Sequence, residues 1–194
     1  MRLMPTMRDV KIYGGLGALL SLLSFVPHIG IVLSIAGLVL ILIAIKYLSD
    51  MVNEPQLFKN MIIAMVAYIV GIVIFFLVVF GTLLSAIFSA PHTPKVSWLP
   101  VLLGVISGLV VLWLACIVGG VFIKRTYDRV AEITGIDLFK TTGLLYLIGS
   151  ALLIVIIGGI ILLVAKVLEA VSFFSIKEES PASPQPPPPP PPVS

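Results

Sequence analysis

Long apolar runs with few charges constrain this chain more than any other feature. They lie at about residues 10–26, 29–48, 61–88, 98–123 and 141–176. Runs of about 18 or more apolar residues are typical of membrane-spanning helices. Because lipid offers no hydrogen bonds, such segments form helices or closed barrels. The runs here do not alternate in polarity as barrel strands do, so they predict an all-α membrane protein.

Composition excludes several other classes. Of the 194 residues, 59% are hydrophobic and 11% are charged, whereas soluble domains carry about 25% charge. The net charge of +3 comes from basic residues at the helix ends, which indicates membrane topology and no nucleic-acid partner. The single cysteine, Cys116, excludes an internal disulfide. No small-residue cleavage site follows the first run, so we do not expect a removable signal peptide.

The last apolar run, Thr141 to Ile176, has two interpretations. A single helix of 36 residues would be about 54 Å long, against a hydrocarbon core of about 30 Å. Either its end leaves the bilayer, which gives five spans, or it folds back at Gly158-Gly159 as a tight hairpin, which gives six. In the hairpin, Ile156 to Gly159 would form the turn.

An internal repeat favours the hairpin. Shifting the N-terminal hairpin by 129 positions places Gly14 on Gly143 and Gly30 on Gly159, with nine identities over the 33 positions from Gly14 to Lys46. The remaining seven positions are Leu16, Ser21, Leu23, Val26, Ile31, Leu33 and Ala36, which meet identical residues at Leu145, Ser150, Leu152, Val155, Ile160, Leu162 and Ala165. Two related hairpins would then flank a longer helix pair.

The distribution of basic residues also favours six spans across the cell membrane, with both termini on its cytoplasmic side. In that layout only Lys95 lies outside, whereas five spans place Lys95, Lys166 and Lys177 there. The cytoplasmic residues would be Arg2, Arg8, Lys11, Lys46, Lys59, Lys124, Arg125, Arg129, Lys140 and Lys177. Against six spans, Lys166 and Glu169 would lie within the last helix, where insertion of each costs a few kcal/mol. We expect six spans and keep five as the alternative.

The chain divides into a transmembrane helical domain, residues 1–176, and a tail, residues 177–194. The tail contains seven consecutive prolines from Pro186 to Pro192. Such a run favours extended polyproline II and cannot join a packed core, so we expect the tail to be disordered.

Two stretches resemble an uncharacterised prokaryotic membrane family, domain of unknown function 996, found largely in archaea. They are Gly14 to Asp50, with its Pro-His-Ile-Gly turn, and Phe122 to Ser150, which reads FIKRTYDRVAEITGIDLFKTTGLLYLIGS. The resemblance implies a multi-pass membrane protein of archaeal origin, and implies no activity. Some relatives carry a Cys-rich module beyond a proline linker, but this chain lacks those cysteines.

Three groups are candidates for a function. Lys166 and Glu169 lie three residues apart on one helical face, and intramembrane ionisable residues mark ion paths or helix contacts. Gly104 and Gly108 have the GxxxG spacing that lets helices approach, within the bundle or in a homodimer. A charged helix extension predicts either a solvated connection or a cytoplasmic docking segment. Its residues are Lys124, Arg125, Asp128, Arg129 and Glu132.

Other chemistry finds little support. His28 and His92 lie in loops without carboxylates, and a zinc site needs three or four ligands. No nucleophile lies near a base and an orienting acid, so we expect no enzyme, cofactor or metal. The leading hypothesis is a scaffold or accessory subunit of a membrane complex, with lipid, other membrane proteins or a second copy as partners. The alternative is a small transporter or channel with Lys166 and Glu169 in its interior.

Overall fold

The computed structural model describes residues 5–23, 29–89, 98–155 and 157–178. Within them the chain forms six α-helices and one short 3₁₀ helix. The helices are α1 (Met7–Leu22), α2 (Gly30–Met51), α3 (Pro55–Ser89), α4 (Leu99–Thr134), α5 (Leu138–Ala151), the 3₁₀ helix η3 (Leu152–Val155) and α6 (Ile157–Phe174). His28, His92 and nearly all of the proposed tail lie outside the described residues.

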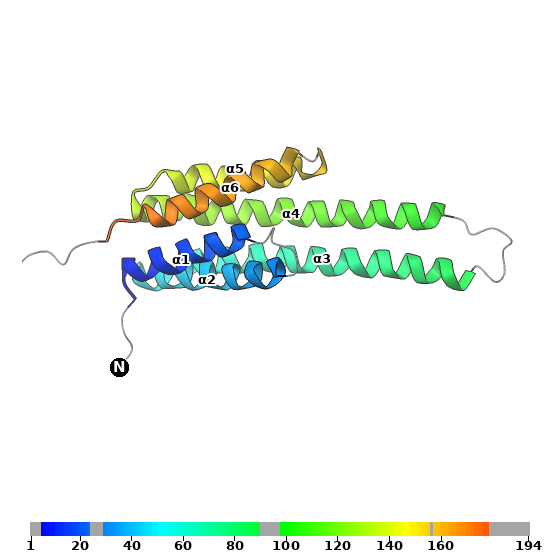
Figure 1. Ribbon diagram of the computed structural model, residues 1–194, viewed down its shortest axis with the longest axis horizontal. Coiled ribbons are helices and arrows are strands. Elements are labelled where there is room, and N and C mark those ends of the chain that lie inside the picture. The colour runs from blue at the N-terminus through cyan, green and yellow to red at the C-terminus, as the bar shows by residue number, and fades with distance from the viewer. Residues whose placement is uncertain (1–4, 24–28, 90–97, 156, 179–194) are drawn as a thin grey trace, which may run out of the picture.

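Each helix packs against its neighbours in the sequence, and α1 also packs against α6, so the six helices close into a ring. Successive helices run in opposite directions (Figure 1). The described chain therefore begins and ends at the same end of the bundle, where Lys11 Nζ lies 3.5 Å from Glu178 Oε1. We call this the charged end, because Lys46, Glu54, Arg129 and Lys140 also lie there.

Helix boundaries follow local signals. At the start of α1, the Thr6 side chain accepts a hydrogen bond from the Asp9 N–H, and the Asp9 carboxylate accepts one from the Thr6 N–H. The charged extension continues α4 without a break to Thr134, as the sequence predicts. It ends at Gly135, whose φ of 70° is in the left-handed region that glycine adopts most easily. Asp137 is the residue directly before α5, and its carboxylate pairs with Lys140 and caps no backbone N–H.

Helices α3 and α4 are far longer than the others, at 35 and 36 residues or about 53 Å. The two flanking hairpins, α1–α2 and α5–α6, cover only the part nearer the charged end (Figure 1). The tip of the second hairpin is marked by Trp113 Nε1, which donates to the Ala151 carbonyl oxygen at 3.0 Å. From Trp113, α4 continues for 14 residues to Leu99, about 21 Å. We call the ends of α3 and α4 that extend beyond the hairpins their far parts. Apolar side chains there, such as Phe88 near the end of α3 and Trp98 just before α4, are 70% exposed.

The C-terminal run folds back as a hairpin, as the repeat predicts, but the predicted position of its turn is wrong. Helix α5 ends at Ala151 and η3 follows, so Gly158 and Gly159 lie in the first turn of α6. The physical reason is close packing. A Cβ on Gly158 would lie 2.4 Å from the Gly149 carbonyl oxygen and 2.3 Å from the Leu153 nitrogen. Gly158 therefore lets α6 start directly against the end of α5.

The fold is an all-α membrane bundle of two related hairpins around a longer helix pair. The repeat offset of 129 maps Leu22, the last residue of α1, onto Ala151, the last residue of α5. Among the described helices, α2 to α6 are long and apolar enough to cross a membrane, and the span of α5 includes η3. Helix α1, with 16 residues, is shorter.

Candidate functional site

All six helices line one cavity of about 220 Å³ inside the ring. We call it the central cavity. Its walls are mostly apolar, and its polar side chains are one serine, three tyrosines, one lysine and one glutamate. The lining residues are Ser21, Leu38, Ile41, Met61, Tyr68, Ile123, Tyr127, Tyr146, Leu162, Lys166 and Glu169.

Glu169 is the most deeply placed charge in the described chain, with 2% of its surface exposed. Both of its carboxylate oxygens accept hydrogen bonds from phenols. The Tyr146 hydroxyl donates to Oε2 at 2.6 Å, and the Tyr127 hydroxyl donates to Oε1. These donors come from α5 and α4, so the carboxylate of α6 joins three helices. Hydrogen bonds to a charged group are stronger than neutral ones, and they offset part of the cost of burying it.

Aromatic packing holds the Tyr127 ring in place. Its centroid lies 5.7 Å from that of Phe139, 6.2 Å from that of Tyr146 and 6.5 Å from that of Phe173. Tyr127, Phe139 and Phe173 are fully buried. Because this cluster leaves the Tyr127 hydroxyl little freedom, Glu169 sits in a preformed site.

Lys166 lines the same cavity, one turn away from Glu169 on α6. The sequence predicts that the two charges share one helical face. In the structure the two side chains form no ion pair within 4 Å. Among the described residues, no hydrogen-bond acceptor is recorded for the Lys166 ammonium either. The cavity therefore holds two opposite charges that are close but not in contact.

The sequence did not predict that three tyrosines line the central cavity. Tyr68, Tyr127 and Tyr146 come from three helices and span 78 positions, and no spacing rule joins them. A weaker signal was present, because a buried tyrosine hydroxyl needs a partner and Glu169 is the only carboxylate between Thr141 and Ile176. In the N-terminal hairpin, the repeat places Gly17 and Gly37 at the positions of Tyr146 and Lys166.

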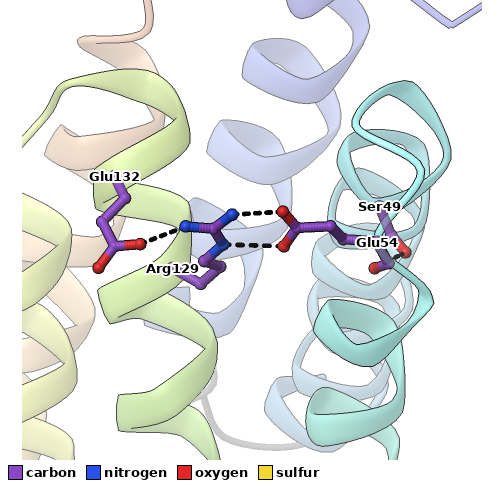
Figure 2. A network of polar contacts seen from close by, with 4 residues as sticks. All are labelled: Ser49, Glu54, Arg129 and Glu132. Carbon is purple, nitrogen blue, oxygen red and sulfur yellow. Dashed lines mark hydrogen bonds and ion pairs between the residues drawn. The ribbon is translucent and has the colours of Figure 1, made fainter.

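The predicted docking residues mostly pair within the chain, and Figure 2 shows Arg129 between Glu54 and Glu132. Arg129 donates from Nε to Glu54 Oε2 at 2.8 Å, from a terminal nitrogen to Glu54 Oε1, and from the other to Glu132. Lys124 pairs with Asp128 one turn on. The Arg125 guanidinium lies 5.4 Å from the centre of the Phe122 ring. Docking by this segment stays a prediction.

The bidentate pair of Arg129 and Glu54 links the α2–α3 connection to α4. Ser49 Oγ donates to the Glu54 carbonyl oxygen at 2.8 Å, which fixes the backbone that carries the carboxylate (Figure 2). The hydrogen bonds from Arg129 lower the pKa of Glu54 below its usual value of 4.5. Because the pair is exposed, it sets geometry more than it adds stability.

Gly104 and Gly108 face α3 in the same chain. A Cβ on Gly104 would lie 2.3 Å from Thr82 Cγ2, and one on Gly108 would lie 3.1 Å from Phe75 Cδ2. The spacing is thus used where the two long helices meet.

Two further features bear on the choice of site. A larger hollow of about 380 Å³ lies between α4 and η3, but its lining holds no ionisable side chain. In the described ranges, no three His, Cys, Asp or Glu residues lie close enough together to hold a metal ion. The central cavity is therefore the candidate site.

Comparison with known proteins gives a family but no activity. The profile of a family described as protein of unknown function, DUF996, matches residues 33–167. An uncharacterized protein of the archaeon Methanocaldococcus jannaschii is 36% identical over 173 residues, which cover 89% of this chain and 94% of that protein. No solved structure matches. The chain belongs to the DUF996 family of proteins of unknown function.

Proposed function

We propose that this protein transports a small solute across the membrane and that the central cavity is its binding site. One observation carries the proposal: a carboxylate and an ammonium line a cavity to which all six helices contribute. Ionisable residues inside a membrane protein are costly, and by default they are candidates for a functional site. Solute sites of transporters also lie between structural repeats, as this cavity lies between the two hairpins.

The repeat supports a functional reading of these polar residues. In the N-terminal hairpin a Cβ on Gly37 would lie 2.4 Å from the Gly17 carbonyl oxygen, so the two helices touch there. The corresponding residues of the C-terminal hairpin are Tyr146 and Lys166. A hairpin of this kind therefore packs without polar side chains at these positions. Their presence in one copy favours a role in binding over a role in folding.

Transport can be tested by counterflow in proteoliposomes. The probes are tracer forms of amino acids, primary amines, monocarboxylates and neutral sugars, each with its own unlabelled counter-solute. We expect at least one probe to accumulate with wild type and to be lost in the Lys166→Gln/Glu169→Gln double variant. The matched control is Lys46→Gln/Asp50→Asn, which removes an exposed pair with a 2.5 Å contact at the charged end. Equal accumulation of every probe by wild type, cavity variant and empty liposomes would refute the proposal.

An accessory role in a membrane complex is the second candidate. The exposed apolar far parts of α3 and α4 favour it, because another membrane protein could cover them. It predicts a native particle much larger than one 20.8 kDa chain after extraction in mild detergent. A particle of single-chain mass, sized by light scattering with the detergent subtracted, would count against it.

A further inference from the structure

The charges of the central cavity suggest what kind of solute it takes. Glu169 receives one phenol hydrogen bond on each oxygen, yet each oxygen keeps a second lone pair. Lys166 offers three donors, and no acceptor for them is recorded among the described residues. An arriving solute therefore meets one unused cation and one partly used carboxylate, three residues apart on α6.

The net charge of the central cavity limits the class of solute that it can bind. Lys166 and Glu169 sum to zero, so the cavity is neutral before a solute enters. A simple anion or a simple cation would leave a net charge in a mostly apolar space, and an uncompensated buried charge is expensive. A solute with both charges pairs each of its groups and keeps the total at zero.

The spacing of the two charged side chains and the size of the cavity limit the class of solute further. Side chains three apart on a helix have Cβ atoms about 5–6 Å apart, so one short molecule can reach both charges. The cavity volume of about 220 Å³ is below the roughly 300–1,000 Å³ of pockets for drug-sized ligands. The rest of the wall includes Leu38, Ile41 and Leu162, which suit a short apolar group.

We infer that the central cavity binds a small zwitterion, an amino-acid-like solute with a short apolar side chain. Its carboxylate pairs with the Lys166 ammonium, and its ammonium donates to Glu169. The phenols of Tyr127 and Tyr146 keep the Glu169 carboxylate aimed at the solute. This inference rests on the proposed function, because it names the class of solute that the cavity carries.

Three nearly isosteric probes test the inference by calorimetric titration of the full-length protein in detergent. Valine carries both charges, valinamide only the ammonium and 3-methylbutanoate only the carboxylate. We expect valine to bind at least about tenfold more tightly than either analogue, because a polar site rejects analogues that leave its groups unpaired. Lys166→Gln should reduce the preference for valine over valinamide. Glu169→Gln should reduce the preference for valine over 3-methylbutanoate.

The outcomes separate the inference from the proposed function. If either analogue binds as tightly as valine, or if valine does not bind while a primary amine, a monocarboxylate or a neutral sugar accumulates in the counterflow assay, the zwitterion assignment is wrong and transport stands. If no probe binds or accumulates, both are wrong. The Lys46→Gln/Asp50→Asn variant, whose changes lie outside the cavity, should bind valine as wild type does. If it loses binding as the cavity variants do, the effect is not specific to the cavity and the assignment fails.

Discussion

Two adjacent glycines provide a sharp test of the hairpin packing. Gly158 and Gly159 both lie in the first turn of α6, and each is replaced by alanine. A Cβ on Gly158 would meet the Leu153 nitrogen at 2.3 Å and the Gly149 carbonyl oxygen at 2.4 Å, and both are backbone atoms. A Cβ on Gly159 would meet nothing within 4 Å. The two substitutions are chemically identical and differ only in what surrounds the new methyl group.

The size of the effect follows from these distances. Ordinary contacts begin near 3.4 Å, so Gly158→Ala must displace the end of α5 by about 1 Å. Forcing a methyl group into a packed region costs about 1–3 kcal/mol. Both variants share the gain in helix propensity of glycine to alanine, about 1 kcal/mol. The propensity term cancels in the comparison, so Gly158→Ala should be less stable than Gly159→Ala by about 1–3 kcal/mol.

The assay is reversible unfolding in mixed micelles of a mild detergent and dodecyl sulfate, followed by far-ultraviolet circular dichroism. We expect the unfolding midpoint of Gly159→Ala at or above that of wild type, and that of Gly158→Ala clearly below that of Gly159→Ala. Equal free energies of unfolding for the two variants would refute the close contact between the start of α6 and the end of α5.

Three further predictions concern the site, the charged end and the membrane. Tyr146→Phe removes the hydroxyl that donates to Glu169 Oε2 at 2.6 Å and should cost about 1.5–3 kcal/mol in the same assay. Tyr47→Phe, whose hydroxyl forms no hydrogen bond with any residue that the structure describes, should cost close to nothing. The pKa of Glu54 is lowered by Arg129, so its contribution to stability is present above pH 4.5 and is lost as the pH falls below it. Arg129→Gln should abolish that part of the acid sensitivity. If the free energy of unfolding changes between pH 6 and pH 3.5 by the same amount in Arg129→Gln as in wild type, the prediction is wrong. In a Cys116→Ala background, the Trp98→Cys variant should react with a membrane-impermeant maleimide on intact cells and the Ile154→Cys variant should not, although both side chains are exposed, at 70% and 65%. Equal labelling would mean that the hairpin tip reaches water.

Sequence patterns predicted most of the fold because its main determinants are local. Apolar length fixes which segments become helices in lipid, and the break at Gly135 follows from one residue that tolerates positive φ. Ile123, Tyr127 and Val130 recur at helical spacing along α4, and the face that they form is buried. The turn of the second hairpin was misplaced because glycine pairs serve both turns and close packing, and only the structure distinguishes these uses.

Long-range contacts between polar residues were beyond sequence reasoning. Glu54 and Arg129 are 75 positions apart, and charge pairs of this kind leave no periodic signal. The same holds for Tyr127 and Glu169, 42 positions apart. The pattern identified Glu169 as costly in lipid but did not identify the groups that offset the cost. Those groups are set by how α4, α5 and α6 pack, which depends on the whole ring.

The two hairpins differ at one pair of equivalent positions. In the first hairpin Gly17 and Gly37 leave no room between the helices, since each would place a Cβ within 2.6 Å of the other's carbonyl oxygen. In the second, Tyr146 and Lys166 occupy the corresponding positions, and both line the central cavity. One copy of the repeat thus uses these positions for close helix packing, and the other uses them to supply a phenol and an ammonium to the cavity.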